Sequence, residues 1–291
     1  MIQCCHMTLK EAIDSARAKK VAIGHFNVSN LEAVHAIKYA VQETGFPAII
    51  GVSDNEEEFF GQDEIVALVK LYQSQGLPIY LNADHAYSVE RAKKCIDAGF
   101  DAVIYDGAEL SHEENIKNTK EVVEYARSKG SKCLIEAEIG FIGKSSNLMD
   151  SIPEGTALEQ FLTKPDEAKS FVEATGVDML APAVGNIHGM LKNMPNPHLD
   201  IPRIEAIYQT IQIPLVLHGG SGISIDDFKK AIASGMCIVH INTEIRLAFK
   251  KALEQGIVDN ADQVAPYKIL KPTQEAMKKV IIEKLKIFNN V

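Results

Sequence analysis

Eight short runs of almost continuously apolar residues recur along the chain, and each is closed by polar residues or glycine. Strands that are buried on both faces of a parallel sheet have this pattern, whereas half-exposed strands alternate apolar and polar positions. We therefore predict eight buried parallel strands. They cover residues 21–27, 47–53, 78–84, 101–107, 132–140, 178–185, 214–220 and 238–243.

Amphipathic stretches lie between these runs, with apolar positions repeating at helical spacing. They cover residues 31–43, 64–75, 89–99, 113–130, 165–176, 201–212 and 224–235, and several end in glycine, a helix C-cap signal. Eight βα units predict an α/β protein: a single closed (β/α)8 TIM barrel domain over residues 1–291, with an extra C-terminal helix at 271–290. An open doubly wound sheet is the alternative, but no G-x-G-x-x-G follows the first strand.

Composition narrows the choice of partners and compartment. The chain has 291 residues and a net charge of −9 without blocks of like charge, which argues against nucleic acid or an acidic membrane as the main partner. We expect neither a signal peptide nor a membrane span, because no apolar run is long enough. The cysteines lack paired metal spacing, so we expect reduced thiols in a cytoplasmic protein. They are Cys4, Cys5, Cys95, Cys133 and Cys237.

Polar side chains cluster where the predicted strands end, which is where barrel enzymes carry their active sites. His85, His188 and His218 follow the third, sixth and seventh strands, and Glu138 ends the fifth. One histidine at a strand end is usually structural, but three at one rim beside a carboxylate are typical of a catalytic zinc site with an open position. His25, inside the first strand, is undecided.

The segment LHGGSG at 217–222 predicts an anion site. Glycines such as Gly219 and Gly220 allow backbone N–H groups to approach an anion, Ser221 adds a hydroxyl, and a helix begins nearby. The loops after the last two strands of this fold often hold phosphate. A flexible turn is the alternative interpretation.

These residues belong to a series of motifs that resembles the class II, metal-dependent ketose-bisphosphate aldolases of the fructose- and tagatose-bisphosphate type. The resemblance covers essentially the whole chain. The matching motifs are, in order, NADHAYS, IYDG with EENIKNTKEVVEYA, IEAEIG, VGNIHG, PLVLHGGSGI and NTEIRLAF.

The resemblance implies roles for individual residues. Asp84 is expected to move the proton of the C4 hydroxyl, and adjacent residues can serve metal and substrate only where the third strand breaks into a loop. Asn27 and Ser53 are expected to line the substrate pocket. The implied metal ligands are His85, Asp106, Glu138, His188 and His218, with Asp106 at a second or alternate metal position. The implied phosphate-binding residues are Gly189, Lys192, Gly219, Gly220, Ser221, His240, Asn242 and Thr243.

Three features depart from the family pattern. The long segment 141–164 lacks the usual acidic pair and carries Lys144 in place of a glycine, leaving Asp150 and Glu154 as the nearby carboxylates. His240 stands where an asparagine is common. Tyr267 and Lys268 lie where relatives often carry an arginine that reaches a neighbouring active site.

The resemblance implies reversible cleavage of a ketose 1,6-bisphosphate, with fructose 1,6-bisphosphate as the first expectation, to dihydroxyacetone phosphate and glyceraldehyde 3-phosphate. The expected cofactor is Zn²⁺; another divalent ion in its place, and a second or monovalent cation, stay open. The expected partners are the phosphorylated sugar and further copies of the chain, in a homodimer or a higher homo-oligomer. Alternatives are a tagatose-bisphosphate or other ketose-phosphate aldolase, an epimerase or isomerase using the same enediolate, and a non-catalytic sugar-phosphate-binding protein.

Overall fold

Eight parallel strands close into a barrel, as predicted, in a computed structural model that describes residues 7–143, 147–152 and 159–291. The strands pair in the order β1-β10-β9-β7-β5-β4-β3-β2. Their bounds are β1 (Ile23–Asn27), β2 (Ala48–Val52), β3 (Ile79–Ala86), β4 (Ala102–Tyr105), β5 (Leu134–Ile139), β7 (Met179–Pro182), β9 (Leu215–Leu217) and β10 (Met236–His240).

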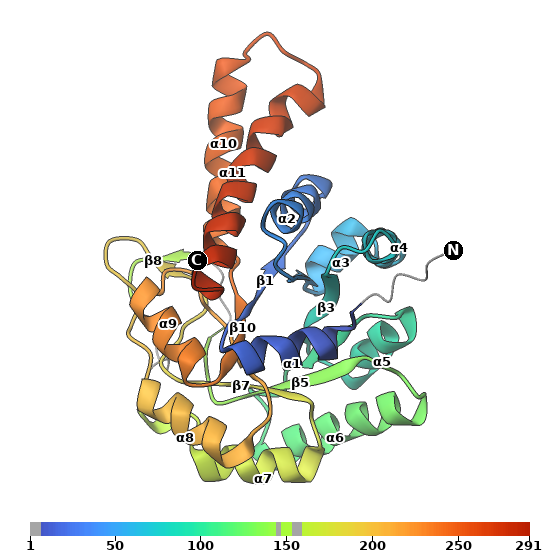
Figure 1. Ribbon diagram of the computed structural model, residues 1–291, viewed down its shortest axis with the longest axis vertical. Helices are drawn as coiled ribbons and strands as arrows, with labels where there is room; N and C mark the ends of the chain where they lie inside the picture. The colour runs from blue at the N-terminus through green and yellow to red at the C-terminus, as the bar shows by residue number, and fades with distance from the viewer. Residues whose placement is uncertain (1–6, 144–146, 153–158) are drawn as a thin grey trace.

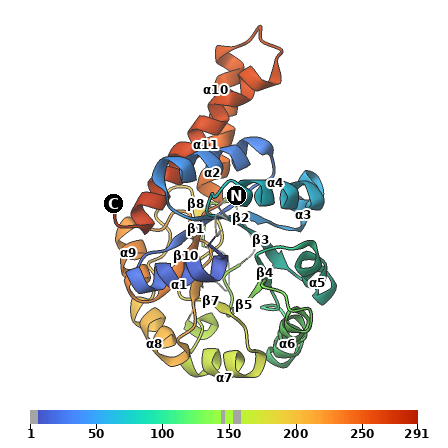
Figure 2. The same cartoon turned by 45° about the vertical axis from the view of Figure 1, so that its right-hand side comes forward.

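Helices surround this barrel, and the seven predicted between strands are all present (Figure 2). They are α2 (Leu31–Thr44), α4 (Gln62–Ser74), α5 (Val89–Ala98), α6 (His112–Ser128), α7 (Pro165–Thr175), α8 (Ile201–Ile211) and α9 (Ile225–Ala233). Three further helices had no predicted range. They are α1 (Leu9–Lys19), before the first strand, the short α3 (Asp54–Phe60), and α10 (Thr243–Asp259), after the last strand.

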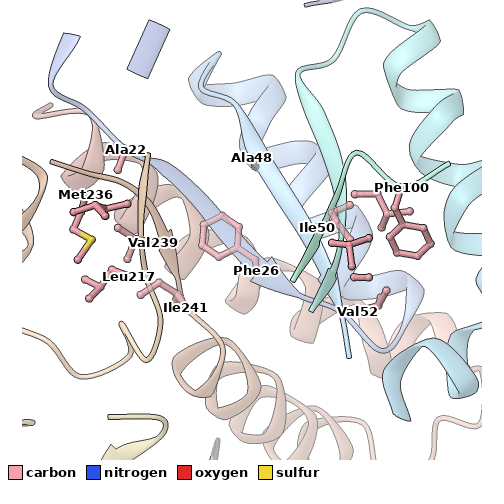
Figure 3. Close-up of a cluster of buried hydrophobic side chains, with 14 of the residues drawn as sticks. Ala22, Phe26, Ala48, Ile50, Val52, Phe100, Leu217, Met236, Val239 and Ile241 are labelled. Atoms are coloured by element: carbon pink, nitrogen blue, oxygen red, sulfur yellow. The ribbon is translucent and has the colours of Figure 1, made fainter. Parts of the chain in front are cut away.

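The apolar core has two parts because alternate residues of each strand point to opposite faces. Phe26, Ile50 and Val239 belong to the outer part, which packs strands against helices (Figure 3). The inner part fills the lower half of the barrel, at the N-terminal ends of the strands. There Leu9 and Ile13 of α1 pack with inward-facing strand residues such as Tyr80, so α1 closes this end.

Inward-facing residues change from apolar to polar toward the C-terminal ends of the strands, which we call the upper end of the barrel. On β3 the series is Tyr80, Asn82 and Asp84, and all three side chains are buried. Leu134, Glu136 and Glu138 of β5 show the same change, as do Ile23, His25 and Asn27 of β1. Two residues further along a strand therefore replace an apolar layer with a polar one.

His85 departs from this alternation, because the residue after an inward-facing Asp84 should face outward. The structure corrects the expectation that β3 breaks into a loop at this point. β3 continues to Ala86 with a bulge, since two of its residues lie between the pairs Ala83–Val103 and Ala86–Tyr105 while β4 has one. His85 has a φ of +58°, in the left-handed region that non-glycine residues seldom adopt. The bulge turns both side chains toward the interior.

The long segment after β5 is tied to the loop after β7. Its strand β6 (Leu148–Met149) pairs with β8 (Met190–Leu191), and a 3₁₀ turn at Glu159–Phe161 precedes α7. Lys144 and Glu154 lie outside the described residues. The structure therefore does not address the replaced glycine or the carboxylate at those two positions.

A helical hairpin of α10 (Thr243–Asp259) and α11 (Pro266–Phe288) extends away from the barrel (Figure 1). The C-terminal helix predicted for residues 271–290 begins earlier, at Pro266. Pro272 therefore lies inside α11 rather than in its first turn. Proline removes one backbone hydrogen bond from a helix. Packing of α11 against α10 and α2 outweighs that loss.

Candidate metal centre and active site

Four side chains from four strands meet at the upper end of the barrel. His85 belongs to the β3 bulge, Glu138 to β5, and His188 and His218 to the segments after β7 and β9. One ligand atom from each lies within 4.8 Å of the others. The structure thus brings the three predicted histidines and Glu138 to one point.

Each imidazole uses one nitrogen for a hydrogen bond that fixes its orientation. His85 Nδ1 is 2.7 Å from Asp106 Oδ2, and His218 Nε2 is 2.8 Å from Glu136 Oε1. His188 Nδ1 contacts the carbonyl oxygen of Gly143. These bonds leave His85 Nε2, His188 Nε2 and His218 Nδ1 for a common ligand. Carboxylates and carbonyls behind metal-binding histidines have this orienting role.

The remaining atoms fit a divalent cation. His218 Nδ1 and Glu138 Oε2 lie 3.1 Å apart, and both are buried without a hydrogen-bond partner. Buried polar atoms are nearly always satisfied, so this pair requires a further occupant. Three imidazoles and a carboxylate are a donor set that zinc accepts.

Asp106 lies outside this group of four. Its Oδ2 holds His85, while its Oδ1 accepts a 3.1 Å hydrogen bond from the backbone N–H of Ala108. In this arrangement Asp106 orients a ligand rather than offering a free oxygen. Glu136 has the same relation to His218, but the sequence analysis gave it no role. Its spacing of two residues from Glu138 on one strand was the available signal.

The carboxylates raise the pKa of two imidazoles. Burial alone lowers the pKa of His85, but the charge of Asp84 and the hydrogen bond with Asp106 raise it to about 9. Burial also opposes the charge on His218, but the hydrogen bond to Glu136 and the nearby charge of Glu138 raise its pKa well above the ordinary value. Burial and the charge of His85 lower the pKa of His188.

Asp84 lies beside the metal-site residues and is held by an amide. Its Oδ2 accepts a 2.8 Å hydrogen bond from Asn27 Nδ2, and its Oδ1 lies 3.7 Å from His85 Nε2. Burial raises the pKa of Asp84, but His85, His25 and His218 and the bond from Asn27 outweigh burial and hold the pKa well below the ordinary value. The side chain is therefore an ionised acceptor.

His25, whose role the sequence left undecided, stacks on His240 inside the barrel. Their ring centroids are 3.5 Å apart with an interplanar angle of 3°. His240 Nδ1 lies 3.6 Å from Asp84 Oδ1, and Asn82 contacts His25. Burial is the main cause that lowers the pKa of His25 to about 4 and that of His240 well below the ordinary value. Both rings are therefore neutral.

A cavity of about 420 Å³ opens above these side chains. Most of the predicted site residues, metal ligands included, line it. They are Asn27, Ser53, Asp84, His85, His188, Gly189, Gly219, Ser221, His240 and Asn242. His218 and Glu138 lie beneath the surface of the cavity, and Gly220 and Thr243 are not part of its lining.

The glycine-rich segment after β9 forms one wall of the cavity. Gly219 has a φ of +62°, and a Cβ there would collide with the carbonyl oxygen of Ile187. Ser221 Oγ accepts a bond of 3.2 Å from the Asn242 N–H, joining this segment to the start of α10. The Gly220 N–H donates to the His240 carbonyl at 2.9 Å and is not directed at a ligand.

Lys192 lies beside the cavity rather than in its wall. Its ammonium group is 3.0 Å from a carboxylate oxygen of Asp150, and 43% of its side chain is exposed. The phosphate role of Lys192 stays a prediction. Because Asp150 pairs with Lys192, the described part of the loop brings no free carboxylate from this position into the cavity wall.

Six residues that line the cavity had no role predicted from sequence: Asp54, Asn55, Glu56, Tyr87, Asn147 and Arg246. Arg246, in the first turns of α10, is the one lysine or arginine among the described lining residues. Its Nη2 lies 2.7 Å from Oε1 of the buried Glu56. These residues are 190 positions apart, and no local pattern indicates that they meet.

Three of the five cysteines that were predicted to be reduced thiols lie among the described residues. Cys95, Cys133 and Cys237 are buried and free. Burial raises the pKa of each thiol, to about 12 for Cys95 and Cys237. Cys4 and Cys5 lie outside the described residues.

Comparisons with known proteins agree with this geometry. The family described as "Fructose-bisphosphate aldolase class-II" matches residues 7–291. Fructose-bisphosphate aldolase of Geobacillus stearothermophilus is 36% identical over 288 residues, covering 98% of this chain and 97% of the relative. The crystal structure of the YdjI aldolase from Escherichia coli K12 has a TM-score of 0.79 at 29% identity and 96% coverage of both chains. A putative fructose-1,6-bisphosphate aldolase from Coccidioides immitis has a TM-score of 0.81 at 28% identity, covering 98% of this chain and 96% of that one.

We expect Glu136→Gln to weaken zinc binding by about tenfold or more, because an amide holds the His218 ring less firmly than a carboxylate does. Competition with a chromophoric chelator measures the affinity. Glu173→Gln, an exposed position on α7, is the control and should leave the affinity unchanged. Equal affinities for both variants would remove Glu136 from the site.

Zinc binding to the metal-free protein should release protons at pH 7. The pKa of His85 is raised to about 9, so the ring is protonated at pH 7 and has to lose its proton before it binds an ion. Affinity should rise as pH increases toward 9, by at most about tenfold per pH unit for each proton displaced. Calorimetry in two buffers of different ionisation enthalpy measures the release, and identical heats in both would contradict it.

Proposed function

The chain belongs to the class-II fructose-bisphosphate aldolase family, and we propose that it reversibly cleaves fructose 1,6-bisphosphate to dihydroxyacetone phosphate and glyceraldehyde 3-phosphate. It is a lyase. The convergence of His85, His188, His218 and Glu138 beneath a cavity that contains Asp84 is the observation that carries the proposal.

His85, His188, His218 and Glu138 would hold a zinc ion. When bound, the ion supplies a Lewis acid that polarises the substrate carbonyl. Asp84 is ionised and faces the cavity beside these residues, which suits a base for the C4 hydroxyl during cleavage and an acid during condensation. Asn27 fixes the orientation of this carboxylate through the 2.8 Å bond to Oδ2.

The lining of the cavity offers groups for two phosphates. Gly189, Gly219, Ser221 and Asn242 line one part, where the glycines allow close approach of an anion to the backbone. Arg246 adds a guanidinium that is 46% exposed despite its bond to Glu56. We assign this guanidinium to the second phosphate. It would take the role of the arginine that relatives often carry where this chain has Tyr267 and Lys268.

The cofactor proposal extends to other cations. Another divalent ion can occupy the same donor set, because imidazole and carboxylate also suit other first-row metals. A second or monovalent cation near Asp106 would have to displace the bond to His85, which makes this position less favourable than the four-ligand group.

We further propose a cytoplasmic homodimer in which each chain is one barrel domain. Near the tip of the α10–α11 hairpin, Ile257, Val258, Val264 and Tyr267 are exposed, with Val264 at 89%. An apolar surface of this kind is favourable to bury against a second copy. Among the described residues, none of the helices is long and apolar enough to cross a membrane.

Zinc-loaded protein should release triose phosphate from fructose 1,6-bisphosphate in a coupled assay, with tagatose 1,6-bisphosphate as the comparison. His218→Ala should abolish metal binding and cleavage together, because it removes a ligand. Asp84→Ala should retain zinc and lower kcat by about 10²–10⁴, the range for a lost acid or base. Conversion of either sugar into an epimer without triose phosphate would favour the isomerase alternative.

Arg246→Ala should raise KM for a bisphosphate substrate by about tenfold or more, because it removes a charge-assisted contact. Fructose 1-phosphate, which lacks the second phosphate, should respond far less to the same substitution. Steady-state kinetics with the two sugars measures the difference. Equal effects on both would mean that Arg246 does not contact the second phosphate.

A further inference from the structure

A continuous chain of hydrogen bonds joins Arg246 to Asp84. Arg246 Nη2 donates to Glu56 Oε1 at 2.7 Å. Asn27 Nδ2 donates to Glu56 Oε2 at 2.8 Å and to Asp84 Oδ2 at 2.8 Å. Glu56, Asn27 and Asp84 are all buried, at 9%, 7% and 3% exposure.

Part of the environment of Glu56 has an ordinary structural explanation. Its Oε2 accepts bonds from the backbone N–H of Ser53 at 3.0 Å and from Ser53 Oγ at 2.8 Å, as the glutamate of a capping box does at the start of a helix. A capping box places no demand on Asn27 or Arg246. Glu56 contacts both, across 29 and 190 residues of sequence.

The amide of Asn27 is committed by these contacts. An amide NH₂ has two hydrogens, and here one is directed at Glu56 and the other at Asp84. The position of the Asp84 carboxylate therefore depends on where Glu56 holds the amide. Two carboxylates share one uncharged donor group, which spaces them apart without neutralising either.

We propose that Glu56 is a positioning residue that acts on Asp84 through Asn27 while it also holds Arg246. One carboxylate thus sets the orientation of the acid–base group and of the cationic group of the same cavity. The inference rests on the proposed aldolase function, in which Asp84 serves the C4 oxygen.

Replacement by methionine tests the arrangement with little change in length. A methionine has no oxygen that can accept from Arg246, Asn27 or Ser53. A glutamine would keep its one oxygen where Asn27 and Ser53 donate to Oε2, and would leave Asn27 in place. With methionine, Asn27 and Arg246 both lose this acceptor. When Asn27 shifts, Asp84 shifts with it, and a misplacement of about 1 Å can cost about 10²-fold in rate.

The experiment compares Glu56→Met with Glu57→Met in the zinc-loaded protein. Glu57 is a matched control because it lies on the same helix, is 4% exposed, and is paired with Arg91 at 3.0 Å, but it does not line the cavity. Four quantities are measured for each variant: kcat and KM for cleavage, zinc content, melting temperature, and exchange of the C3 hydrogen of dihydroxyacetone phosphate with deuterated solvent.

Glu56→Met should lower kcat for cleavage by about 10–10² and leave C3 exchange within about twofold of wild type, because exchange involves no C4 oxygen. Zinc content should be unchanged. Glu57→Met should change neither rate. The kcat effect should persist when Glu56→Met is combined with Arg246→Ala, since it acts through Asn27.

Equal losses of cleavage and exchange, or the same losses in both variants, would show a general structural role for Glu56 and overturn the inference. Disappearance of the kcat effect in the Arg246→Ala background would show that Glu56 acts only on Arg246, and would also overturn it. If the wild-type protein neither cleaves the sugar nor exchanges the hydrogen, the proposed function itself fails.

Discussion

The alternation of side chains along a parallel strand determines what this barrel can hold. Inward positions recur every second residue, so the inward positions that follow the apolar layer of Tyr80, Leu134 and Ile23 are those of Asn82, Glu136 and His25. Apolar residues there fill the lower half and leave the upper half to polar groups. The candidate site is therefore a continuation of the core rather than a separate addition on loops.

The barrel, its eight strands and the residues around the metal centre were predictable from sequence, because apolar runs and strand ends are local features. The chain identifies the neighbours His85, His188, His218 and Glu138 by their position alone. The way in which Asp84 and His85 both face inward was not predictable. It requires a bulge and a left-handed residue, and neither has a signature in NADHAYS.

Residues missed from sequence have in common that their partners are distant. Glu136 orients His218 across 82 positions, and Glu56 meets Arg246 across 190. A glutamate that caps a helix and a glutamate that holds an active-site amide look the same in a linear pattern. The stacking of His25 on His240 likewise depends on the pairing of β1 with β10, the closure of the barrel itself.

Helix α1 closes the lower end of the barrel, so the barrel is open at its upper end alone. Leu9, Ala12, Ile13 and Ala16 pack into the lower mouth, where the neighbouring side chains are almost fully buried. The barrel axis is thus a dead end, and anything that reaches the histidines has to arrive and depart through the same opening. The sugar enters and both products leave through the mouth of the same cavity, so the products have to dissociate before the next sugar can bind.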